Sequence, residues 1–163
     1  MALSSESNTL LDISGLKYVK GKKITIIATE WNDNIVAAQI SGAEKIAEKT
    51  GAVICKKMFV PGSFELTFAA KKHFENAQAN KQAPDAIILF GAVIRGGTPH
   101  FEYVCKAITE GAVLLNLTLP IPVIFGVLTL DEEQQAWDRL GGQHGHKGEE
   151  AMIAALKMIQ IDY

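Results

Sequence analysis

The segment from Gly91 to His100, GAVIRGGTPH, joins a glycine-rich turn to a histidine at the start of an expected helix. The apolar run Ala86 to Phe90 precedes it. Thr98 is expected to cap the helix and Pro99 to take its first position, where a missing N–H costs nothing. The free N–H groups of a helix start attract phosphate, and histidine exchanges protons near neutral pH. The segment therefore predicts chemistry on a phosphorylated small molecule.

The same segment also has a purely structural interpretation. A Gly-Gly-Thr-Pro helix start is often only a turn, and a single histidine is more often structural than catalytic. Arg95 either faces a ligand or is held in a salt bridge. Local chemistry slightly favours the anion site, and both interpretations stay open.

Two further strand-like runs end in turns that carry polar or aromatic side chains. After the first run, Trp31 offers an aromatic face and Asn32 a donor and an acceptor for a planar polar heterocycle. The structural alternative, which these residues alone favour, makes Asn32 or Asp33 the cap of a helix and packs Trp31 on Val36.

After the second run, Ser63 and Glu65 are suited to bind the hydroxyls of a polyol, and Gly62 permits close approach of the backbone. The structural alternative is at least as good for this turn. In it, Ser63 caps the next helix and Glu65 is a first-turn carboxylate favoured by the helix dipole.

Beyond a fourth apolar run, basic residues lie near another helix start. Arg139 is suited to bidentate phosphate recognition, and Lys147 is a flexible point charge. His144 and His146 are poorly spaced for a metal on a glycine-rich loop that no carboxylate or cysteine completes. We expect no metal site and no cofactor.

These turns belong to an alternation of strands and helices. Strands are expected at Lys23–Thr29, Ala52–Val60, Ala86–Ile94 and Pro122–Leu128. Helices are expected from about Asp33 to Lys49, from Ser63 to Ala79, from Pro99 to Leu117, from a capping box at Thr129–Glu132 to Gly141, and from Gly148 to Ile159.

This alternation predicts an α/β fold: a three-layer α/β/α sandwich, doubly wound and flavodoxin-like, with a mainly four-stranded parallel sheet. Residues 1–14 form a polar N-terminal segment and residues 15–163 a single domain. Ligands bind such sheets where the strands end, so the four turns are expected to converge.

Composition narrows the class of protein. The chain has 163 residues, 48% of them hydrophobic, and a formal net charge of −2. This charge argues against nucleic-acid binding. Cys55 and Cys105 look buried and free, as in a reducing compartment. No signal peptide or membrane span is expected, so the predicted location is cytoplasmic.

Several motifs in a fixed order make the chain resemble the lumazine synthase family of riboflavin biosynthesis from about Gly15 onward. These motifs are Trp31-Asn-Asp33, Ser41-Gly-Ala43, Val60-Pro-Gly-Ser-Phe-Glu65, Gly91-Ala-Val-Ile-Arg-Gly96 with Thr98 and His100, Tyr103-Val-Cys105, Pro122-Val-Ile-Phe-Gly126 and Lys147-Gly148.

The resemblance implies condensation of 5-amino-6-(D-ribitylamino)uracil with 3,4-dihydroxy-2-butanone 4-phosphate to 6,7-dimethyl-8-ribityllumazine, phosphate and water. It also implies a role for each site residue. For the pyrimidine, Trp31 stacks on the ring, the backbone of Ala92, Val93 and Ile94 binds its edge, and Lys147 lies near it; Asn32, Ser63 and Glu65 bind the ribityl chain. For the second substrate, Gly97, Thr98 and Arg139 hold the phosphate, and His100 moves protons. The resemblance also implies that a neighbouring subunit supplies Phe125, Arg139 and Lys147.

As partners, the resemblance implies the two small-molecule substrates and further copies of the chain, forming a pentamer and then a shell of sixty. Riboflavin synthase is a candidate partner. Three positions depart from the family's usual residues: Trp31 replaces phenylalanine, Ala92 threonine, and His146 asparagine. Two alternatives remain: a flavin- or nucleotide-binding module without chemistry, and a structural shell protein.

Overall fold

A computed structural model describes residues 12–161, so most of the polar N-terminal segment lies outside the described residues. Four strands form a parallel sheet of order β2-β1-β3-β5. The strands are β1 (Lys23–Thr29), β2 (Val53–Val60), β3 (Ala86–Phe90) and β5 (Val123–Phe125).

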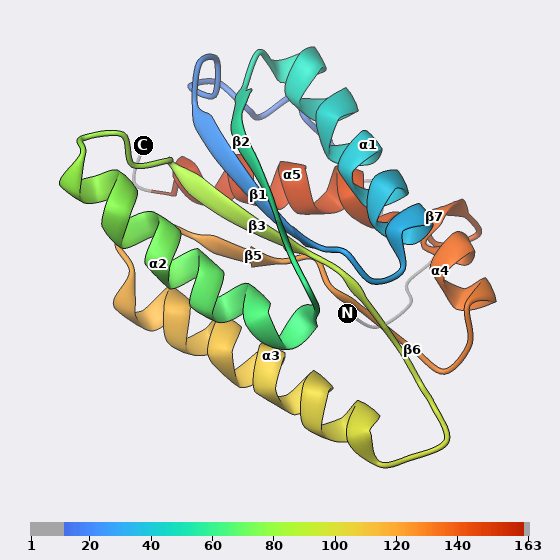
Figure 1. The fold of residues 1–163 in the computed structure, drawn as a ribbon. Helices are drawn as coiled ribbons and strands as arrows, with labels where there is room; N and C mark the ends of the chain where they lie inside the picture. Colours follow the sequence, from blue (N-terminus) through green and yellow to red (C-terminus); the bar gives the residue numbers. More distant parts are fainter. Residues whose placement is uncertain (1–11, 162–163) are drawn as a thin grey trace.

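Helices cover both faces of this sheet (Figure 1). One face carries α1 (Asp33–Thr50) and α5 (Lys147–Ile159), and the other carries α2 (Leu66–Ala79) and α3 (His100–Thr118). The predicted three-layer α/β/α sandwich with a four-stranded parallel sheet is therefore confirmed.

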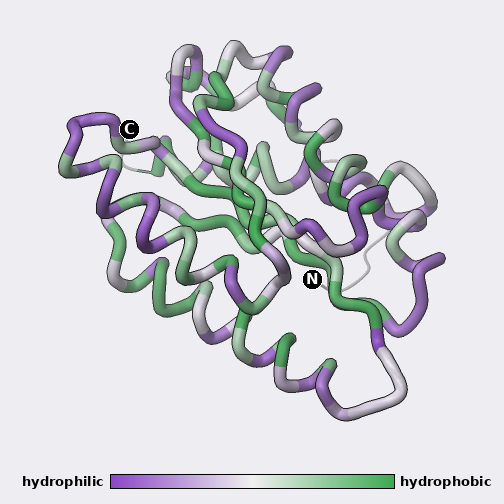
Figure 2. Tube along the Cα trace, in the orientation of Figure 1, coloured by the Kyte–Doolittle hydropathy of each residue, from purple (hydrophilic) through white to green (hydrophobic). Residues whose placement is uncertain are grey.

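The two central strands supply the core, because successive side chains of a strand point to opposite faces. In β1, Ile24 and Ile26 pack with α1 and α5, whereas Ile27 packs with α2 and α3. All five residues of β3 are buried. Figure 2 shows the same apolar strands at the centre of the molecule, between helices in which hydrophilic and hydrophobic residues alternate.

The prediction that both cysteines are buried is wrong. Cys55 is exposed and Cys105 is only partly buried, although both are free as expected. Cys55 lies in β2, whose residues are mostly exposed because β2 is an edge strand of the described sheet. In one chain, β2 is therefore not covered by helices on both faces along its length.

The third predicted strand is interrupted. It ends at Phe90 and resumes after Gly91 as β4 (Ala92–Ile94), which pairs with β6 (Leu128–Leu130) in a separate two-stranded sheet. The fourth predicted strand divides in the same way, into β5 and β6. The glycine at the first break is required by close packing, because a Cβ on Gly91 would lie 2.9 Å from Cγ2 of Thr29.

The predicted capping box at Thr129–Glu132 is wrong. Thr129 lies in β6, where it is the partner of Val93, so it is not available to begin a helix. The helix that follows, α4 (Gln134–Asp138), is short, and the side chain of Gln135 accepts a hydrogen bond from the Asp131 backbone N–H at 2.8 Å.

After α4 the chain forms a small antiparallel hairpin of β7 (Leu140–Gly142) and β8 (Gly145–His146), where the sequence predicted the end of a helix. The hairpin leads directly into α5. Across residues 12–161, no helix combines the length and apolar character that crossing a membrane requires.

Candidate active site

The carboxyl ends of β1 and β3 are joined through Asn32. Asn32 occupies the N-cap position of α1 in a left-handed conformation, with φ 58° and ψ 48°, but its side chain does not cap the helix. Instead, its Nδ2 donates to the carbonyl oxygen of Ala92 at 2.9 Å. The same side chain therefore fixes where the first residue of β4 lies.

Trp31 lies beside this contact and is 73% exposed. Thr29, buried at the end of β1, donates its hydroxyl to the Trp31 carbonyl oxygen at 3.0 Å and so fixes the turn. Because Val36 is buried while the indole is exposed, the structure does not support packing of Trp31 on Val36. The indole face is open to a ligand.

Gly62 lies between Trp31 and Glu65. A Cβ on Gly62 would lie 3.2 Å from Oε2 of Glu65 and 3.9 Å from Cδ1 of Trp31. A short 3-10 helix, η2 (Ser63–Glu65), positions the carboxylate before α2 begins. The structure thus brings an aromatic face and a carboxylate together at the ends of β1 and β2.

Ser63 is not the helix cap of the structural alternative, because Gly62 occupies the N-cap position of η2. Ser63 is buried, and its Oγ lies 3.0 Å from the place that a Cβ on Gly91 would occupy. This serine therefore lies between the turn after β2 and the break that precedes β4.

The glycine turn after β4 leads to α3, but the helix begins one residue later than predicted. Pro99, not Thr98, is at the N-cap position, and His100 is the first helical residue. Gly97, Thr98 and His100 are all exposed, and nothing lies within 4 Å of a Cβ built on Gly97. The start of this 19-residue helix is open to solvent, as an anion site requires.

Of the two arrangements expected for Arg95, a ligand-facing side chain or a salt bridge, the structure shows the salt bridge. Its Nε donates to Asp131 at 2.6 Å and its second nitrogen donates to Glu102 in the first turn of α3. The guanidinium also lies 4.1 Å from the centre of the Phe101 ring. Arg95 therefore ties the start of α3 to the end of β6.

Arg139 follows the last residue of α4, and Lys147 is the first residue of α5. The Arg139 guanidinium donates to the His144 carbonyl oxygen at 2.5 Å and to Oε2 of Glu150 at 3.0 Å. The Lys147 N–H donates to the Arg139 carbonyl oxygen at 2.7 Å, and burial lowers the pKa of the Lys147 ammonium. Arg139 and Lys147 thus flank the β7–β8 hairpin, one just before β7 and the other just after β8.

Phe125 lies apart from both groups. It is partly buried at the end of β5 and lines a cavity of about 350 Å³ with residues of the C-terminal half of α3. Within one chain, the structure therefore brings together Trp31, Asn32, Ser63, Glu65 and Ala92. None of the contacts described above links Phe125, Arg139 or Lys147 to these five residues.

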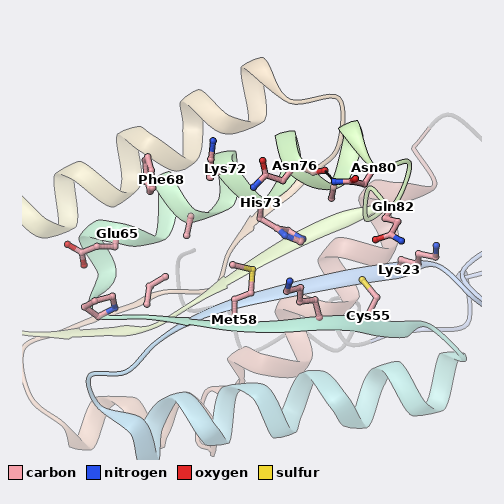
Figure 3. A pocket seen from close by; sticks show the side chains of 15 residues that line it. Lys23, Cys55, Met58, Glu65, Phe68, Lys72, His73, Asn76, Asn80 and Gln82 are labelled. Carbon is pink, nitrogen blue, oxygen red and sulfur yellow. Dashed lines mark hydrogen bonds between the residues drawn. The ribbon is translucent and has the colours of Figure 1, made fainter.

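A groove of about 770 Å³ that the sequence analysis did not anticipate runs between β2 and α2 (Figure 3). Glu65 lies at one end of it. Farther along, the Thr25 hydroxyl lies 3.0 Å from Nε2 of His73 and 3.7 Å from Sγ of Cys55. Burial lowers the pKa of His73, and nearby Lys56 lowers it further.

No group of three or more histidine, cysteine, aspartate or glutamate side chains in the described part of the chain is arranged to hold a metal ion. The sequence does not predict the groove between β2 and α2 for a simple reason. His73 and Cys55 come from elements distant in sequence, and nothing local marks them as neighbours.

Comparison with known proteins assigns the family. The family described as 6,7-dimethyl-8-ribityllumazine synthase matches residues 21–162. The protein of that name from Parabacteroides distasonis is 42% identical over 99% of this chain and 99% of its own length. Its namesake from Bacteroides fragilis is 48% identical over 85% of this chain and 95% of its own length. The chain thus belongs to the 6,7-dimethyl-8-ribityllumazine synthase family.

Proposed function

We propose that this enzyme condenses 5-amino-6-(D-ribitylamino)uracil with 3,4-dihydroxy-2-butanone 4-phosphate, forming 6,7-dimethyl-8-ribityllumazine and releasing phosphate and water. The observation that carries the proposal is the family match over residues 21–162. A non-catalytic flavin- or nucleotide-binding module, or a purely structural shell protein, is not favoured.

The pyrimidine substrate would bind at the ends of β1, β2 and β3. The exposed face of Trp31 stacks on the ring, and the backbone of Ala92, Val93 and Ile94 binds its polar edge. Because Nδ2 of Asn32 already donates to Ala92, its side-chain oxygen is the group left to accept a bond from a ribityl hydroxyl. Glu65 accepts from further hydroxyls.

The role of Ser63 follows from its position. Its Oγ lies beside Gly91 and is buried, so it meets only the part of the ribityl chain that enters deepest between the turn after β2 and β4. The experiment that separates this role from a packing role is the KM of Ser63→Ala for the ribityl substrate.

The phosphorylated substrate would bind at the open start of α3. Gly97 and Thr98 offer backbone N–H groups there, and the helix dipole favours an anion. His100, the first helical residue, is close enough in sequence to pass protons to and from substrates held at this turn. A bound phosphate favours the protonated imidazole.

No covalent nucleophile is needed for this reaction. The uracil amine attacks the ketone and forms an imine with loss of one water, phosphate leaves by elimination, and the ring closes with loss of a second water. Holding two substrates in the correct orientation supplies about 7–11 kcal/mol, whereas one acid–base group typically supplies about 10²–10⁴-fold in rate. Orientation is therefore expected to dominate catalysis.

A complete site would require a second subunit. The guanidinium of Arg139 pairs with His144 and Glu150, and Phe125 lines a different cavity. We propose that a neighbouring copy supplies Phe125, Arg139 and Lys147 to the site. The proposed assembly is a pentamer that associates further into a shell of sixty copies in the cytoplasm, with riboflavin synthase as a candidate partner. In this assembly Arg139 joins Gly97 and Thr98 at the phosphate.

The test of the proposed function is direct. Purified protein is mixed with both substrates, and lumazine formation is followed by its absorbance. We expect product only when both substrates are present. A yellow protein that retains a flavin but forms no lumazine would support the binding-module alternative instead.

A further inference from the structure

Gln39 is a fully buried polar residue in the middle of α1, at 0% exposure. Its Nε2 donates to the carbonyl oxygens of Gly126 at 2.9 Å and Gly91 at 3.3 Å. Because both partners are acceptors, only the NH₂ side of the amide is able to face them. Among the described residues, Oε1 of Gln39 has no hydrogen-bond partner. Burying the amide oxygen without a hydrogen bond costs free energy, which the two bonds donated by Nε2 offset in part.

The two carbonyl groups lie where the strands are interrupted. Gly91 separates β3 from β4, and Gly126 follows β5 directly. A Cβ on Gly126 would lie 2.6 Å from Cδ1 of Phe90, closer than the 2.9 Å at Gly91 described above. The chain therefore turns from one sheet to the other through two crowded glycines, and Gln39 holds both.

Gln39 acts on the same strand as Asn32. Asn32 is the N-cap residue of α1, and Gln39 lies seven positions farther along, about two helical turns into the helix. Their amides bind the consecutive carbonyl groups of Gly91 and Ala92. The start of β4 is thus held from α1 at two successive peptide groups.

We propose that Gln39 is a positioning residue for the pyrimidine substrate. By fixing the Gly91 and Gly126 carbonyls, it sets the place of the β4 backbone at residues 92–94, which binds the ring in the proposed function. Gln39 itself is buried and does not contact substrate. The inference therefore rests on the proposed function and deepens it.

The phosphate turn provides an internal comparison. This turn is held by a different side chain, Arg95, whose partners are Asp131 and Glu102. Gln39 makes no hydrogen bond to either of them. A change at Gln39 should therefore affect the two substrates unequally. The affinity for the ribityl uracil should weaken, and the affinity for the phosphorylated ketone should stay the same.

The experiment is steady-state kinetics of Gln39→Met, which keeps the side-chain length and removes the donor. We expect the KM for the ribityl uracil to rise about tenfold, equivalent to about 1.4 kcal/mol, with an unchanged KM for the phosphorylated substrate. Ile46→Ala is the matched control, since Ile46 is buried on the same helix two turns farther on. It should lower the Tm and leave both KM values unchanged.

If Gln39→Met does not fold, Gln39→Asn takes its place, because its amide is one methylene shorter and reaches the carbonyls poorly. Its KM should shift in the same direction. A folded variant with both KM values at the wild-type level, or with both raised equally, would overturn the role of Gln39 alone. A wild-type enzyme that forms no lumazine would instead overturn the proposed function, and this inference with it.

Discussion

The side chain of Asn32 donates to the Ala92 carbonyl oxygen at 2.9 Å and so ties the start of α1 to the start of β4. The bond joins two segments about sixty residues apart in the sequence. It also joins the proposed ribityl-binding residue to the backbone proposed to bind the ring. A single contact therefore links the positions of both parts of one substrate.

Replacing Asn32 should weaken both stability and substrate binding. Asn32→Ala loses the hydrogen bond, at about 1 kcal/mol, and places alanine in a left-handed conformation at a cost of roughly 1–2 kcal/mol. Urea unfolding should show the combined loss, and the KM for the ribityl uracil should rise. Asn32→Gly is the matched control, because glycine tolerates φ 58° and lacks only the amide.

In the glycine variant most of the stability should return while the KM stays raised. A wild-type KM in Asn32→Gly would show that the amide contributes nothing to binding.

His100→Ala should slow turnover and leave easily measured activity. The imidazole is exposed at the start of α3, so its loss should not disturb the fold, and one acid–base group typically contributes about 10²–10⁴-fold. Single-turnover measurement of lumazine formation checks this. Complete loss of activity in a variant that assembles normally would mean that proton transfer, rather than orientation, limits the rate.

Arg139→Ala should raise the KM for the phosphorylated substrate. Charge-assisted hydrogen bonds contribute about 1.5–3 kcal/mol, which corresponds to roughly 10–100-fold. Lys45→Ala is the control. Like Arg139→Ala, it removes an ion pair to a glutamate of α5, in this case the pair between Lys45 of α1 and Glu149. Its kinetics should match the wild type. If Arg139→Ala keeps the wild-type KM, Arg139 does not bind the phosphate.

Stability should fall as the pH drops below 6.5, in part because of His73. In the folded state, burial lowers the pKa of this imidazole below its ordinary value of 6.5. Between the folded and unfolded pKa values the unfolded chain binds more protons, so acid favours unfolding there. Urea unfolding of His73→Gln, compared with the wild type from pH 8 downward, should show a shallower loss. Parallel curves would exclude His73 as a source of the pH dependence.

Much of the fold follows from local sequence patterns. The limits of β1 match the prediction at both ends, and α1 differs by one residue, because continuous apolar runs and helical spacing mark these elements directly. The turns at Trp31, Glu65 and His100 were also placed correctly at the strand ends. Parallel strands bring such turns to one edge of a sheet, so the approach of the Trp31 and Glu65 turns around Gly62 is predictable without coordinates.

The features that the sequence did not reveal depend on distant neighbours. The break at Gly91 reflects packing against Thr29 and Ser63, and Thr129 pairs with Val93 instead of capping a helix. Gln39 follows an ordinary helical pattern, and only the sheet shows which carbonyls its amide meets. The proposed contribution of a neighbouring subunit would likewise lie beyond any single-chain pattern.

The central claim is that two neighbouring subunits share each active site, and mixed assemblies test it most directly. Glu65→Ala and Arg139→Ala alter opposite halves of the proposed site, and each variant alone should be strongly impaired when both substrates are limiting. Coexpressed in equal amounts, they should regain about a quarter of the wild-type activity, since each site takes its halves from two randomly chosen subunits. Activity that never exceeds the average of the two variants would contradict a shared site.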